Sequence, residues 1–436
     1  MSDCKDLKDL FRKVSKMAMD ISGNIHFFFH YVFHDSRHWQ NLLNYLESVR
    51  NYINLSYAEL WILRIAIQLH DIGLFLSPRS WNEFQISKED LVQPNNNHNN
   101  LLTELKRTLM VRALLDNLKQ SFEEAFFDEN NYLRLPSPLA RKPWDEFNLI
   151  EKTAIRHIMR KLHAIIGSRA VVKKFVGTST QECRKVSEIV GTMVRLHEGK
   201  YKEEVKNLGL WDISDSPIDL KKVTALLIML DAIDCAGVSR ASPRTLDEII
   251  DEIRLLEERI IEIERKYDRE RAVKNPPEYI AHWIFKRYIK RVDIEPGKVI
   301  ILTETTEPAY MAGIIFFEIA NNVWPKFHLA QEILQEYGFH FDLVVKTPSS
   351  ELSISNIADK ITKLSNIFHE AIVNENGISQ LSKGESNIVY GLTLPRTLAL
   401  LLSHGYVSIA NQILCETLHI SDADNWFKEL LSAIDE

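Results

Sequence analysis

The chain has 436 residues, of which 45% are hydrophobic and 26% charged, the composition of a soluble globular protein. Its length predicts about two to three domains. Its formal net charge of −7 excludes a general electrostatic affinity for nucleic acid or anionic membranes, although a local basic cleft stays open.

The sequence predicts neither a membrane span nor a disulfide scaffold. The longest apolar runs, ALLIML and MAGIIFF, are too short for a bilayer, and the charged amino-terminal stretch lacks a signal-peptide core. The four cysteines form no CxxC pair and have no regular spacing, which argues for a reduced compartment and against a zinc ribbon. We therefore expect a cytoplasmic protein.

Helical periodicity dominates the first part of the chain, where strand-like alternation is nearly absent. Polar or proline-rich breaks at residues 93–100 and 132–144 predict loops. Helices are expected over residues 7–21, 37–49, 57–70, 101–127, 149–175, 183–198 and 221–235. These helices predict an all-α domain over residues 1–240.

A charged stretch over residues 246–267 follows, with apolar residues at approximately heptad spacing. About three heptads is the lower limit for a coiled coil. A coiled coil, a helix packed on the protein's own body and a dimer seam all stay open. This helix could therefore dock a second copy or another protein.

The sequence pattern changes again after two consecutive prolines at 276–277. Residues 292–303 predict two strands around a Pro-Gly turn, 308–337 a helical segment, and 341–346 another strand. We expect a small α/β subdomain within residues 241–346 and a helical region over residues 347–436. The expected fold class is mainly α, a helical bundle with an α/β appendage and a C-terminal helical region.

The helix predicted over 57–70 ends in a histidine and an aspartate. Only Arg64 and Gln68 interrupt its apolar run, so the helix is expected to be buried on most sides. A buried imidazole and carboxylate at His70 and Asp71 need a partner, and a divalent cation would serve both. Gly73 is expected to provide a left-handed helix stop that lets the two side chains converge.

Two further residues could complete such a site. Asp231 lies in the apolar run LLIMLDAIDC, and His38 lies in the first turn of its predicted helix. Two histidines and two aspartates suit Mn, Fe, Co, Ni or Zn and leave positions for water and substrate. Asp234 either supports the site from outside or simply stands near the helix end.

The sequence resembles the HD-domain superfamily of metal-dependent phosphohydrolases. The resemblance lies in three elements and their order: His38, then the HDIG tetrad at residues 70–73, then Asp231 in LLIMLDAID. The resemblance covers roughly residues 25 to 240 and is greatest to the HD-CE type, often found in bacterial conflict (antiviral defence) systems. It implies an HD-type helical bundle that binds one or two divalent ions. His163 and His197 stand where members with a second ion carry additional ligands. No GYP signature follows the doublet, which weighs against cyclic-dinucleotide specificity.

Phosphate chemistry also needs fixed positive charge near the metal. Arg240, which follows Asp231, and Arg160, three residues before His163, are the candidate contacts for a substrate phosphate. Asp71 is the candidate bridge between two ions, holding a metal-activated hydroxide in line with phosphorus.

Two functions from different classes follow. The first is hydrolysis of a phosphoester of a nucleotide or a short nucleic acid, with phosphodiesterase and nuclease activity as variants. The second is a regulatory or interaction module of a conflict system, which senses a nucleotide or docks a partner. An inert module would be expected to have lost ligands, and His38, His70, Asp71 and Asp231 are all present.

Overall fold

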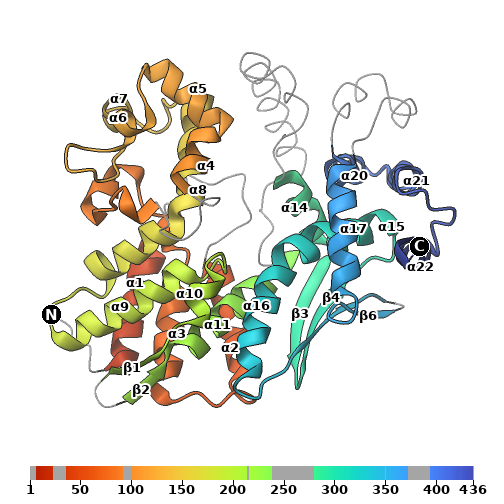
Figure 1. Cartoon of the computed structure of the whole chain (residues 1–436), viewed down its shortest axis with the longest axis horizontal. Helices are drawn as coiled ribbons and strands as arrows, with labels where there is room; N and C mark the ends of the chain where they lie inside the picture. Colours follow the sequence, from red (N-terminus) through yellow and green to blue (C-terminus); the bar gives the residue numbers. More distant parts are fainter. Residues whose placement is uncertain are drawn as a thin grey trace. The chain divides into compact units, whose positions relative to one another are not determined.

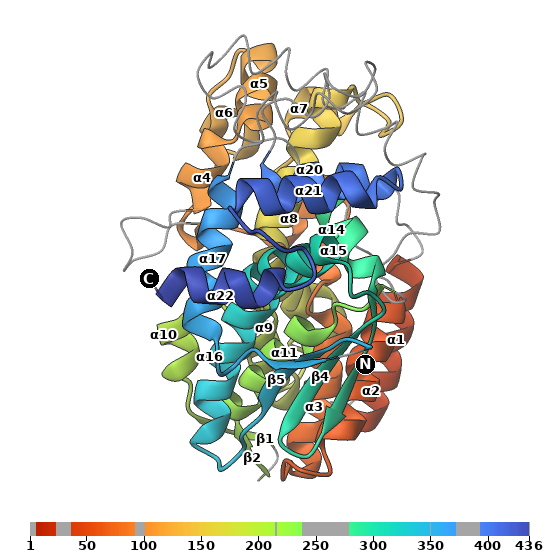
Figure 2. The same cartoon turned by 90° about the vertical axis from the view of Figure 1, so that its right-hand side faces the viewer.

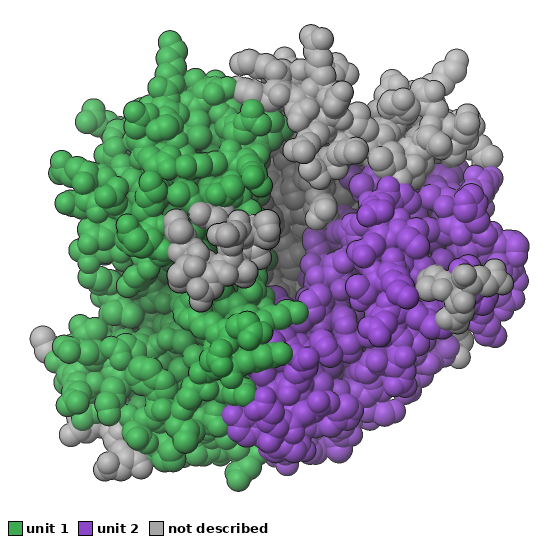
Figure 3. Space-filling view, viewed as in Figure 1, with its two compact units in different colours: residues 1–29, 54–228 green, residues 30–53, 229–436 purple. Residues whose placement is uncertain are grey.

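The computed structural model describes residues 6–22, 36–91, 101–213, 216–237, 279–348, 350–371 and 393–435. Helices dominate these residues, so the predicted mainly α fold is confirmed. Two compact units are present (Figure 3). The first comprises residues 1–29 and 54–228, and the second comprises residues 30–53 and 229–436.

The first unit is built around the helix α3 (Tyr57–Leu69), which packs against α1 (Leu7–Ser22) and α9 (Gln181–Leu196) (Figure 1). In turn, α9 packs on the long helix α8 (Leu149–Ala170). The side chain of Ser56 accepts from the Glu59 amide at 3.2 Å, and the Glu59 carboxylate accepts from the Ser56 amide at 2.8 Å. This capping box defines the start of α3.

The expected single helix over 101–127 is wrong, because the chain breaks there into three helices. They are α4 (Leu101–Arg107), α5 (Leu109–Leu118) and α6 (Phe122–Phe126). Lys119 adopts a left-handed conformation with φ 54°, which ends α5, and Ser121 caps the next helix. The first unit also contains the short helices α7 (Ser137–Ala140) and α10 (Lys202–Lys206), several 3₁₀ turns and a π-helical turn over Val171–Phe175.

A short β-hairpin precedes the helix that carries Asp231. Strands β1 (Leu210–Ile213) and β2 (Ser216–Asp219) pair antiparallel, and α11 (Leu220–Ile233) follows directly. The sequence did not indicate this hairpin, because four-residue strands containing proline and aspartate show no clear alternation. Its prediction of a helix over 221–235 is confirmed.

The second unit contains the predicted α/β appendage. Its sheet has the order β3-β4-β5-β6, with β3 (Ile289–Glu295) antiparallel to β4 (Lys298–Thr303) and β4 parallel to β5 (Asp342–Lys346). Gly297, with φ +74°, makes the turn between β3 and β4. The sequence did not indicate the edge strand β6 (Glu351–Ser353), which pairs antiparallel with β5.

Helices make up most of the rest of the second unit, as far as the structure describes it. The crossover from β4 to β5 runs through α15 (Pro308–Ala312), a π-helix over Gly313–Val323, and α16 (Trp324–Gln335). Helix α20 (Leu394–Ser403) contacts both α14 (Tyr279–Arg287) and α21 (Val407–Thr417) (Figure 2). The remaining bounds are α2 (Ser36–Val49), α17 (Ala358–Glu370) and α22 (Trp426–Asp435).

Two predictions from the sequence are not tested by the described residues. The helix expected over 246–267 lies outside the described residues, and the three-part domain division stays a prediction.

Cys183 is disulfide-bonded, which the sequence did not indicate, because spacing along the chain does not reveal which cysteines meet in space. Among the described residues, no helix combines the length and apolarity that crossing a bilayer requires.

Candidate metal centre

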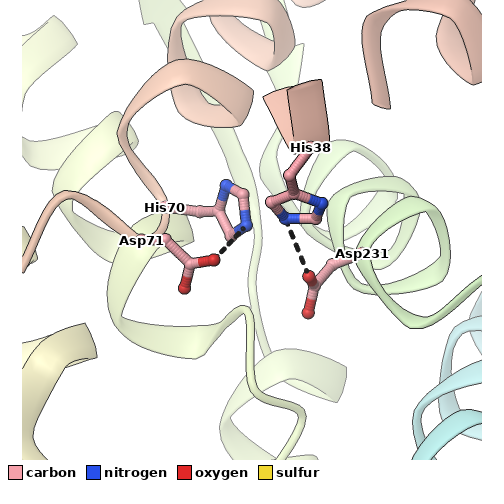
Figure 4. Close-up of side chains that lie close together, drawn as sticks. All are labelled: His38, His70, Asp71 and Asp231. Atoms are coloured by element: carbon pink, nitrogen blue, oxygen red, sulfur yellow. Dashed lines mark ion pairs between the residues drawn. The ribbon is translucent and has the colours of Figure 1, made fainter. Parts of the chain in front are cut away.

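The His-Asp doublet lies in the turn that follows α3. The Nε2 of His70 is 3.1 Å from the Oδ2 of Asp71, and both side chains are buried (Figure 4). The Nδ1 of His70 donates to the carbonyl of Ile67 at 2.9 Å. That hydrogen bond assigns the proton to Nδ1 and the lone pair to Nε2, the form in which imidazole binds a metal.

Gly73 does not adopt the left-handed conformation expected of it. It belongs to a 3₁₀ turn over Ile72–Leu74, and its φ is not positive. A glycine is needed for a different reason, the close approach of α8. A Cβ at Gly73 would lie 2.0 Å from the carbonyl oxygen of His163 and 2.9 Å from the amide nitrogen of Gly167. The doublet and His163 are thus held together by direct backbone packing.

His163 and His197 face the other oxygen of Asp71. Their Nε2 atoms lie 3.4 Å and 3.5 Å from Asp71 Oδ1. The Nδ1 of His163 donates to the carbonyl of Arg160, and that of His197 to the carbonyl of Val194, both at 2.7 Å. One ligand atom from each of Asp71, His163 and His197 lies within 4.8 Å of the others, so this buried group could hold a metal ion.

The donor chemistry of this group fits a cation. With both Nδ1 atoms used as donors, the lone pairs of His163 and His197 face each other across 3.3 Å between their Nε2 atoms. Two facing lone pairs repel, and a divalent ion bound by both nitrogens and by Asp71 would remove that repulsion. Burial lowers the pKa of His197, although Asp71 opposes the shift. A lowered pKa favours the neutral ring that a metal requires.

Glu198 is a charged neighbour of this group that the sequence analysis missed. Its Oε1 lies 3.9 Å from both His163 Nε2 and Arg160 Nη1, and its Oε2 lies 2.8 Å from the ammonium of Lys200. Burial alone would raise its pKa, but electrostatic interactions with His163, Lys200 and Arg160 lower the pKa overall. Its position directly after His197 was the only signal in the sequence.

The two predicted phosphate-binding arginines have different outcomes. Arg160 Nη1 lies 3.5 Å from His163 Nε2, with the side chain partly exposed, so this guanidinium stands beside the candidate ligands. Arg240 lies outside the described residues.

In the second unit, His38 of α2 lies between Asp231, in the last turn of α11, and Asp234, directly after that helix. Its Nε2 is 3.5 Å from Asp231 Oδ1 (Figure 4), and its Nδ1 donates to Asp234 Oδ2 at 2.5 Å. Asp234 also accepts from the amide of Asn41 at 3.1 Å and the hydroxyl of Tyr45 at 3.5 Å. Of the two open alternatives, Asp234 therefore supports the histidine and does not merely stand near the helix end. Such a carboxylate orients a metal-binding imidazole.

Asp231 has a second neighbour that the sequence did not indicate. The ammonium of Lys326, in the first turn of α16, lies 2.8 Å from Asp231 Oδ2. The two residues are far apart along the chain, and no motif connects them.

No curated protein and no solved structure matches this chain. A family model described as HD-CE matches residues 28–325, well over half of the chain. The matched region includes all of the predicted metal ligands. The chain therefore belongs to the HD-CE family, a family related to the HD domain.

Proposed function

We propose that this protein is a metal-dependent phosphohydrolase that cleaves a phosphoester of a nucleotide or a short nucleic acid. One divalent ion would be held by His38, His70, Asp71 and Asp231, and a second by Asp71, His163 and His197. Mn, Fe, Co, Ni and Zn all suit these nitrogen and oxygen donors. A cytoplasmic location and a role in a bacterial defence system stay predictions.

The observation that supports this function most directly is that the two oxygens of the Asp71 carboxylate face different imidazoles. Oδ2 faces the Nε2 of His70, and Oδ1 faces the Nε2 atoms of His163 and His197. A carboxylate with imidazoles at both oxygens is suited to bridge two cations, and paired cations are common in phosphoester hydrolysis.

The residues around Asp71 have separable tasks in such a reaction. Bound divalent ions would supply Lewis acidity and a water nucleophile available at neutral pH. Asp71 would hold that nucleophile in line with phosphorus. Arg160, partly exposed beside His163, would bind a non-bridging phosphate oxygen and stabilise its negative charge. The net charge of −7 favours a small nucleotide or a nucleic-acid end over a long duplex.

The test combines metal analysis with a hydrolysis screen. The purified protein would be assayed with Mn²⁺, Co²⁺ and Ni²⁺ on nucleotides, cyclic dinucleotides and single-stranded oligonucleotides. We expect bound metal and release of phosphate or nucleotide, both lost in Asp71→Ala. Asp116→Ala, which changes an exposed aspartate of α5, should retain both. A wild type without metal and without activity would instead favour the regulatory or interaction module.

A further inference from the structure

The two carboxylate oxygens of Asp231 face different residues of the second unit. Oδ1 faces His38 Nε2 at 3.5 Å, and Oδ2 accepts a hydrogen bond from Lys326 Nζ at 2.8 Å. The Asp231 side chain is 8% exposed and that of Lys326 is 26% exposed. This contact is therefore shielded from water, unlike a surface ion pair, which contributes little.

Local helix geometry determines where Lys326 lies. Pro325 provides no amide hydrogen and would clash with a carbonyl one α-helical turn earlier, and the helix before it is wound as a π-helix over Gly313–Val323. Immediately after Lys326, Phe327 is fully buried and anchors the first turn of α16 in the core. Lys326 thus lies between a π-helix and a fully buried phenylalanine.

We propose that Lys326 is a positioning residue of the metal centre that limits Asp231 to a single coordinating oxygen. The inference rests on the proposed function. Because the ammonium places a positive charge at Oδ2, we expect the ion at Oδ1, the oxygen that faces His38 Nε2. Coordination through one oxygen keeps a further position at the ion for water or a phosphate oxygen.

The positive charge of Lys326 has a second consequence. It withdraws electron density from the Asp231 carboxylate and repels a divalent ion, so it weakens metal binding. The same charge keeps the ion more electrophilic and adds attraction for an anionic substrate. Lys326 is therefore expected to lower the affinity of the site for the ion and to raise the reactivity of the bound ion. Both effects can be measured.

The test is Mn²⁺ titration by isothermal calorimetry on the full chain, comparing the wild type with Lys326→Met and Lys326→Arg. We expect Lys326→Met to bind Mn²⁺ on the order of tenfold more tightly, because it removes a nearby positive charge. It should also lower kcat at saturating metal, whereas Lys326→Arg should keep the wild-type affinity within about threefold. Lys290→Met, which removes the exposed ion pair with Glu304, is the matched control and should change neither value.

The outcomes separate the two proposals. Unchanged or weaker Mn²⁺ binding by a folded Lys326→Met, with normal binding by the wild type, would overturn the role of Lys326 alone. A wild type that binds no Mn²⁺ would overturn both this role and the proposed function. Thermal unfolding of each variant shows whether it is folded.

Discussion

The Nδ1 of His38 lies 2.5 Å from the Oδ2 of Asp234, and both side chains are completely buried. Since Asp234 also accepts hydrogen bonds from Asn41 and Tyr45, its carboxylate is held in place from three sides. The bond directs His38 Nε2, the candidate ligand atom, toward Asp231. The imidazole is thereby held in the orientation that the proposed ion would require.

The first prediction concerns this orientation. Asp234→Asn should reduce Mn²⁺ affinity by about 10- to 100-fold, because the amide no longer stabilises the required tautomer of His38. Calorimetric titration would measure the loss, and Asp424→Asn, at an exposed aspartate, should have no effect. Equal affinities in Asp234→Asn and the wild type would show that Asp234 does not orient a ligand.

Gly73→Ala should destabilise the first unit by about 3 kcal/mol or more, because the new methyl group would lie 2.0 Å from the carbonyl oxygen of His163. Urea denaturation would measure the free energy of unfolding. Gly209→Ala is the matched control, since nothing lies within 4 Å of its Cβ and the cost should stay within about 0.5 kcal/mol. Similar stabilities for the two variants would contradict the close packing of α8 on this turn.

The HDIG tetrad illustrates how far the sequence could predict the site. A buried apolar helix ending in His70 and Asp71 predicted that both side chains are buried, and this burial is confirmed. Their role as metal ligands stays a prediction. The role given to Gly73 was wrong, because its neighbour is the backbone of α8, more than 80 residues later along the chain. Periodicity describes a residue's own helix and gives no information about what packs against it.

The second metal group makes a prediction about stoichiometry. Replacing both His163 and His197 with alanine should reduce bound metal from two ions to one per chain, since Asp71 would retain only His70 as an imidazole neighbour. Metal analysis by mass spectrometry would count the ions. His157→Ala, on the same helix as His163, should leave the count unchanged. One ion in both the wild type and the double variant would restrict the centre to a single metal.

His157 predicts a pH dependence of stability that is separate from the metal site. Burial lowers its pKa from 6.5 to about 4, with Lys161 contributing in the same direction. Between these values the unfolded chain binds a proton that the folded chain does not, so stability falls as the pH decreases from about 6.5 toward 4. His157 should lower the free energy of unfolding by about 2 kcal/mol at pH 5 relative to pH 7.

Urea denaturation of the wild type and His157→Gln at both pH values would test this. The variant should lose about 2 kcal/mol less than the wild type on acidification. His328→Gln, at an exposed histidine, should behave like the wild type. An unchanged pH dependence in His157→Gln would mean that this imidazole is not kept neutral by the fold.

Other parts of the site could not be predicted, for physical reasons. Lys326 reaches Asp231 because a π-helix and the sheet crossover bring α16 there, and no local pattern encodes that contact. Glu198 looks like an ordinary residue at a helix end until its burial beside His163 is known. The α/β appendage could be predicted, because alternating strands and a Pro-Gly turn are local signals.

The central claim is that His38, His70, Asp71 and Asp231 bind one divalent ion. Anomalous diffraction at the manganese edge, from crystals grown with Mn²⁺, tests it most directly. We predict an anomalous peak about 2.2 Å from the Nε2 atoms of both histidines and from a carboxylate oxygen of both aspartates. Crystals with no manganese at these residues, or with an ion that contacts only one of the two His-Asp pairs, would contradict the account.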